Sequence, residues 1–148
     1  MEKLNKVPDF WLTAKISEDI FNEFGTYLQF DQPFPAYNTR FPGKLEGILE
    51  SVRQTFDNQP LNATILDAAA AYFNQIIRGH PFQNGNKRFA VLLTHYFLLM
   101  NGVDFTLSFQ GMYNFALGVA LFSKDLNSEQ TKRICKKIIA KYTKEISL

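Results

Sequence analysis

Two apolar segments with a helical period, separated by a short loop, constrain the fold of this chain most strongly. In residues 62–78 one helical face carries Ile65, Ala68, Ala69, Tyr72, Phe73 and Ile76. In residues 85–100 it carries Phe89, Leu92, Leu93, Tyr96, Phe97 and Met100, with Val91, Leu98 and Leu99 further round. We expect the second helix to be buried on most sides, at the centre of a bundle. Asn62 is the expected N-cap of the first helix, and Asn101-Gly102 ends the second.

Weaker helical patterns occupy most of the remaining chain. They predict helices over residues 17–30, 43–56, 108–122 and 128–143, with Ser17, Ser108 and Ser128 as N-caps. Residues 30–43 contain several prolines and aromatic residues, and we expect a surface loop or short hairpin there. No other segment predicts a strand. The chain is therefore expected to be all-α, with about six helices in a single domain spanning residues 1–148.

Composition excludes several classes of protein. With 46% hydrophobic and 20% charged residues, the chain can bury a core, which argues against disorder. The net charge of +2 is small, and the basic residues between Lys132 and Lys141 fit a solvated helix face, so we do not expect nucleic-acid binding. Residues 89–100 are too short to span a bilayer, and no signal peptide is evident. We expect a cytoplasmic protein with no membrane partner, in which the single Cys135 is a core or boundary residue.

The loop at residues 79–85 and the helix start that follows it break the local rules. Acidic residues are favoured in the first turn of a helix, where the unpaired N–H groups and the dipole are positive, but Lys87 and Arg88 stand there instead. A bound anion such as phosphate would compensate both cations, and Gly85 would let it approach the backbone. Asn84 is the expected N-cap. The alternative is that Lys87 and Arg88 simply point to solvent.

The two histidines have different expected roles. His80 lies beside the possible anion site and can titrate near neutral pH, which suits a general base that accepts a proton from an attacking hydroxyl. Phe82 is expected to anchor the loop in the core and fix His80. His95 lies on the buried helix and is interpreted as a structural histidine. Two histidines and one cysteine in these positions do not predict a zinc site.

Residues 80–88, which read HPFQNGNKR, resemble the signature of the Fic/Doc (Fido) family. The Fic branch has H-x-F-x-[D/E]-G-N-G-R-x-x-R and the Doc branch of toxins has H-x-F-x-[D/N]-x-N-K-R. This chain is similar to the Doc form, because Lys87 replaces the Fic glycine and Val91 stands where Fic has its last arginine. The resemblance covers residues 40–106 well and the two ends less well.

The resemblance implies a compact helical Fido fold and ATP, or another nucleoside triphosphate, as donor. By position, His80 would deprotonate a Ser, Thr or Tyr hydroxyl of a protein substrate. Gly85, Asn86 and Lys87 would form an anion-binding hole, and Arg88 would hold a terminal phosphate. The Doc branch is associated with transfer of the γ-phosphate to elongation factor Tu, which blocks translation. We therefore expect phosphotransfer, with Fic-type transfer of AMP as the second possibility.

One residue departs from the Fic pattern. Asn84 stands where Fic has an acid that ligates Mg²⁺, and a neutral amide is a weaker ligand for this cation. Either the nucleotide itself holds the metal, with Asn84 as a weak candidate ligand, or activity is low and the chain is a Fido binding module. Residues 30–43 correspond to the family's target-docking flap, with a plain connection as the alternative. The chain contains no [S/T]-x-x-x-E-[G/N] inhibitory motif, so a separate antitoxin protein is expected to restrain it.

Overall fold

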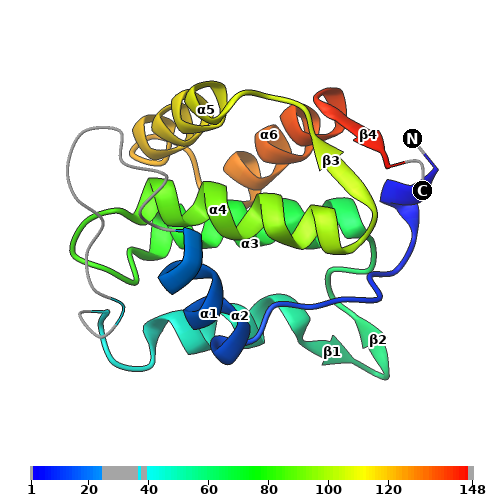
Figure 1. Ribbon diagram of the computed structural model, residues 1–148, viewed down its shortest axis with the longest axis horizontal. Helices are drawn as coiled ribbons and strands as arrows, with labels where there is room; N and C mark the ends of the chain where they lie inside the picture. The colour runs from blue at the N-terminus through cyan, green and yellow to red at the C-terminus, as the bar shows by residue number, and fades with distance from the viewer. Residues whose placement is uncertain (1, 25–36, 38–39, 147–148) are drawn as a thin grey trace.

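The computed structural model describes residues 2–24, 37 and 40–146, and these residues form six α-helices, one short 3-10 helix and four short strands. Figure 1 shows α3 (Ile65–Gly79) and α4 (Asn86–Met100) side by side across the middle of the molecule. On one side of this pair lie α1 (Ala14–Phe24) and α2 (Lys44–Arg53), and on the other lie α5 (Phe109–Phe122) and α6 (Ser128–Lys141). The mostly helical fold confirms the expected class.

The apolar faces predicted for the two central helices are those that the structure buries. All six predicted residues of α3 are buried, from Ile65 to Ile76. In α4 the predicted stripe is buried except for half-buried Tyr96 and exposed Met100 at the end of the helix, and Leu99 is also exposed. The helix ends where expected, since Asn101 is its C-cap and Gly102 follows with a positive φ of 79°. The two helices therefore form the centre of the core.

Four short strands were not expected. The strands β1 (Thr55–Phe56) and β2 (Gln59–Pro60) form a hairpin around Asp57 and Asn58, both of which have a positive φ, as a tight two-residue turn requires. The strands β3 (Val103–Phe105) and β4 (Thr143–Glu145) pair antiparallel across a long stretch of sequence. Each strand is two or three residues long, too short to show an alternating pattern. The prediction of a helix up to residue 56 is wrong, since α2 ends at Arg53 and residues 55 and 56 form β1. The strand is too short for its pattern to reveal the end of the helix.

Several helix starts differ from prediction by a few residues. The helix α1 begins at Ala14, where the Thr13 hydroxyl accepts a hydrogen bond from the Ile16 N–H, while Ser17 lies buried inside the helix. For α3 the N-cap is Thr64 rather than Asn62, whose amide instead donates to the Val52 carbonyl.

The helix α6 is capped by Asn127 rather than Ser128, in a capping box with Gln130. Ser108 caps α5 as predicted, with its side chain accepting from the Gly111 N–H. The end of the first predicted helix, residues 25–30, lies outside the described residues. So does most of the predicted loop at residues 30–43.

Candidate functional site

The site is built on the loop that joins the two central helices. His80 ends α3 in the left-handed conformation, with φ 49° and ψ 63°, and its N–H donates to the Ile76 carbonyl. Gly85 begins α4 with φ 78°, and it rather than Asn84 is the N-cap. A residue with a side chain is seldom held in the left-handed region, and such residues cluster at functional sites. His80 is exposed, so the loop presents its imidazole to ligands.

An aromatic cluster anchors the loop in the core. Phe82 is buried and its ring lies 4.9 Å from that of Phe89, 5.5 Å from that of Phe21 and 6.1 Å from that of Tyr37, measured between centroids. The cluster thus joins the loop to α1, to α4 and to Tyr37. Because Phe82 is two residues from His80, this packing holds the backbone that carries the imidazole.

Asn86 uses its side chain to hold the same loop. Its Oδ1 accepts a hydrogen bond from the Phe82 N–H at 2.9 Å, and its Nδ2 donates to the Phe82 carbonyl at 2.7 Å. The Nδ2 also lies 3.5 Å from Nδ1 of His80, at the outer limit of hydrogen bonding. The side chain of Asn86 is therefore engaged in loop structure, and only its backbone N–H can face an anion.

The first turn of α4 presents positive groups to one side of this loop. No side chain caps the helix at Gly85, and the first turn contains no acidic residue. Helix geometry leaves the first N–H groups without an intrahelical carbonyl partner. Lys87 is half-buried and Arg88 is only 2% exposed. The alternative in which both side chains point into solvent is thus wrong for Arg88.

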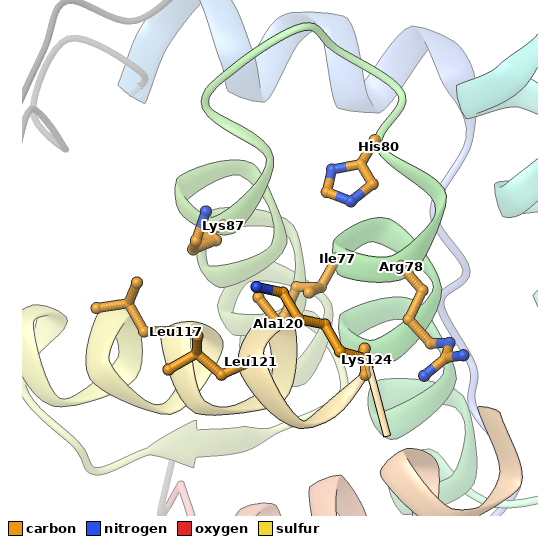
Figure 2. A pocket seen from close by; sticks show the side chains of 9 residues that line it. Ile77, Arg78, His80, Lys87, Leu117, Ala120, Leu121 and Lys124 are labelled. Atoms are coloured by element: carbon orange, nitrogen blue, oxygen red, sulfur yellow. The ribbon is translucent and has the colours of Figure 1, made fainter. Parts of the chain in front are cut away.

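Two pockets share His80 and Lys87 among their lining residues. The smaller has a volume of about 210 Å³ and is formed by the loop, the start of α4 and one side chain of α5; it is lined by His80, Gln83, Asn84, Gly85, Asn86, Lys87, Arg88 and Tyr113. The larger, of about 470 Å³, opens between the end of α3, the start of α4 and the second half of α5, and Figure 2 shows its lining. Its size is typical of a site for a small molecule.

The pockets are positively charged. Of the described residues that line them, Arg78, Lys87, Arg88 and Lys124 carry a positive charge, and none is an aspartate or glutamate. A group of cations around a concave surface favours an anionic ligand. The sequence predicted His80, Lys87 and Arg88 here, but it gave no sign of Tyr113 or Lys124, because only tertiary packing brings α5 to this loop.

Residues set apart from this site match their expected structural roles. Burial lowers the pKa of His95, although Asp104, with its carboxylate 3.5 Å from Nε2, opposes this shift. Burial raises the pKa of the Cys135 thiol to about 12. On the basic face of α6, Lys136 forms a 2.6 Å ion pair with Asp67. The His95–Asp104 pair joins α4 to β3, and the Lys136–Asp67 pair joins α6 to α3.

Metal-ligating clusters and membrane-spanning helices are both absent from the part of the chain that the structure describes. Within residues 2–24, 37 and 40–146, no three side chains of His, Cys, Asp or Glu are grouped in a way that could hold a metal ion. In the same ranges, no helix has both the length and the apolar character needed to cross a membrane.

Comparison with known families agrees with this arrangement. The sequence model described as the Fic/DOC family matches residues 10–98, more than half of the chain, from the segment before α1 to near the end of α4. No curated protein and no solved structure gives a significant match. Members of this family generally transfer nucleotide or phosphate groups to proteins, which indicates a transferase that uses ATP. With its helical Fido-type fold, the chain belongs to the Fic/DOC family.

Proposed function

We propose that this protein transfers the γ-phosphate of ATP to a Ser, Thr or Tyr hydroxyl of a protein substrate, as a toxin of the Doc branch. The observation that carries the proposal is that His80 and Lys87 line both pockets, one at the end of α3 and the other in the first turn of α4. A base and a cation that line the same positively charged pockets are what phosphoryl transfer to a hydroxyl requires.

The amino end of α4 would hold the transferred phosphate. The N–H groups of Gly85, Asn86 and Lys87 and the helix dipole favour an anion there. The ammonium group of Lys87 adds a mobile point charge, and the buried Arg88 supplies a second cation from the wall of the smaller pocket. The side chain of Asn86 holds the loop in this shape through Phe82.

His80 would accept the proton of the attacking hydroxyl. In the reaction the hydroxyl oxygen forms a bond to the γ-phosphorus, and the bond from that phosphorus to the bridging oxygen breaks. ADP leaves, and the hydroxyl proton passes to a nitrogen of the imidazole. The anchored loop supports this role, because the contacts of Phe82 and Asn86 hold the imidazole beside the pocket.

Magnesium would be bound chiefly through the phosphate oxygens of the nucleotide. Asn84 is exposed at the rim of the smaller pocket and offers one neutral amide oxygen, while no carboxylate is among the described lining residues. The ion would neutralise charge that develops on the phosphates during transfer.

The biological role proposed here follows from Lys87. Lysine at this position is typical of the Doc branch, so we propose phosphotransfer ahead of transfer of AMP. The proposed consequence is a block of translation, with elongation factor Tu as a possible target protein. A separate antitoxin protein would restrain the activity, and the site of action would be the cytoplasm.

A binding module is the second candidate function. It is favoured by one observation, the neutral Asn84 in a pocket whose described lining contains no carboxylate. If metal binding by the protein is needed for transfer, such a site would bind nucleotide without using it. The fold and the pockets would then serve recognition alone.

Purified protein incubated with cell extract and radiolabelled ATP separates these functions. Phosphotransfer predicts that label at the γ-position moves to a protein band and that label at the α-position does not. Transfer of α-label would instead show AMP transfer. Nucleotide binding without either transfer would favour the module. His80→Ala should bind ATP and lose transfer, and full activity in this variant would refute the assignment of the base.

A further inference from the structure

Lys124 places a second ammonium group in the larger pocket, away from the motif loop. It is the second residue after α5 and belongs to the lining of that pocket, together with Leu117, Ala120 and Leu121 of that helix. Figure 2 shows its side chain running back over Ala120, toward the part of the pocket that Lys87 and His80 border. The pocket therefore has one ammonium group from α4 and one from the turn that follows α5.

The backbone around Lys124 is fixed by hydrogen bonds. The Lys124 N–H donates to the Leu121 carbonyl, and the Leu126 N–H donates to the Phe122 carbonyl at 2.9 Å. Arg78, in the last turn of α3, donates from Nη1 to the Leu126 carbonyl at 3.1 Å. This contact ties the connection after α5 to the helix that carries His80. The position of Lys124 relative to the motif loop is thus set by α3.

A lysine at the end of a helix is favoured by the helix dipole in any protein. Two observations set Lys124 apart from that general preference. Its side chain lines a pocket of about 470 Å³, and none of the described residues lining this pocket is acidic. The ammonium groups of Lys87 and Lys124 therefore share one cavity without a protein counter-charge within its described lining. An anion with charge at more than one point would satisfy both.

We propose that Lys124 is a ligand-binding residue that contacts a second phosphate, so that the pocket selects compounds with two or more linked phosphates. This inference rests on the proposed function, because it assumes that the first phosphate lies at Lys87. It adds a residue of the turn after α5, which lies beyond the residues that match the family. The pocket then distinguishes a phosphate chain from a single phosphate because only the chain can contact both Lys87 and Lys124.

Calorimetric titration with inorganic tripolyphosphate and with orthophosphate, at one ionic strength, tests this inference. Lys124→Ala should raise the Kd for tripolyphosphate about fivefold, and Lys124→Glu should raise it further, because a charge-assisted contact is removed or reversed. The Kd for orthophosphate should stay within about twofold in both variants, since a single phosphate lies at the Lys87 end. Lys137→Ala removes an exposed lysine of α6 that lines neither pocket, and it should change neither Kd.

The possible failures can be told apart. Tripolyphosphate binding that is unchanged in both Lys124 variants would overturn the inference and leave the proposed function standing, provided that Lys87→Ala still weakens binding. An equal rise in the Kd for both probes in Lys124→Ala would also overturn it. That pattern would indicate that Lys124 acts through the overall electrostatic field of the pocket rather than through contact with a second phosphate. If wild-type protein binds neither probe, or if Lys87→Ala binds both normally, the proposed function fails together with the inference.

Discussion

Asn86 binds both polar groups of the Phe82 backbone through one side chain, with its Oδ1 2.9 Å from the Phe82 nitrogen and its Nδ2 2.7 Å from the Phe82 oxygen. These two hydrogen bonds connect the first residue of α4 back to the loop between α3 and α4, and with the intervening backbone they close a ring. A residue that the sequence suggested as part of an anion hole thus acts through its side chain on the shape of the loop. The backbone N–H groups that follow Gly85 are left for the anion.

Asn86→Ala should lower the free energy of unfolding by about 1–3 kcal/mol, because the buried N–H and C=O of Phe82 lose their partner. Chemical denaturation followed by circular dichroism measures this change. Asn114→Ala is the matched control, since Asn114 lies exposed on α5 and its loss should cost less than about 0.5 kcal/mol. Equal effects of the two substitutions would show that the ring does not stabilise the loop.

Phe82→Ala should cost about 3–5 kcal/mol of stability, because it leaves a cavity within the aromatic cluster. It should also reduce transfer, since His80 loses its anchor. Phe56→Ala serves as control, because Phe56 is 75% exposed and its removal should change stability by less than about 0.5 kcal/mol. Thermal denaturation of both variants gives the comparison, and a Phe82→Ala protein as stable as wild type would contradict the packing described here.

The lowered pKa of His95 predicts that the free energy of unfolding depends on pH. Burial lowers its pKa in the folded protein from the ordinary value of 6.5, with partial opposition from Asp104. The unfolded chain therefore binds a proton first as the pH falls. The stability contributed by neutral His95 is complete above pH 6.5, and it is lost as the pH falls from there through the folded pKa.

His95→Gln should consequently lose less stability than wild type between pH 7 and pH 5. The measurement is the free energy of unfolding in urea at both values, compared between the two proteins. Because the other titrating groups are shared, the difference between them isolates His95. An identical pH dependence would show that burial does not perturb this ring.

Cys135 should be inert in the folded protein. Its thiol is buried and its pKa is raised to about 12, so little thiolate exists at pH 8. Ellman's reagent should react with it slowly in buffer and within seconds to minutes in guanidinium chloride, where the chain is unfolded. Fast reaction in buffer at a rate independent of denaturant would contradict the burial.

The central helix pair was predictable because its pattern is local. A period near 3.6 residues over a dozen positions specifies both the helix and the face that it buries, as in the run from Ile65 to Ile76. The loop chemistry was also readable, since two cations follow Gly85 where acids are favoured. These signals need no knowledge of the rest of the chain.

Features that depend on distant segments were missed. Val103 pairs with Glu145 across some forty positions, and strands so short leave no pattern of their own. Lys124 reaches the pocket only because α5 packs against α4. The predicted N-cap of α5, Ser108, was right. The prediction of Ser128 for α6 was wrong for a local reason, because two residues that can cap a helix, Asn127 and Ser128, stand side by side. The capping box formed by Asn127 and Gln130 was readable in the sequence and would have identified the start of α6.

The most direct test of the central claim is a crystal structure of the protein with Mg²⁺ and a non-hydrolysable ATP analogue. We predict that a phosphate lies against the N–H groups at the start of α4, within hydrogen-bonding distance of Lys87, with the imidazole of His80 beside it. A nucleotide bound elsewhere on the protein, with the start of α4 left to solvent, would contradict the account.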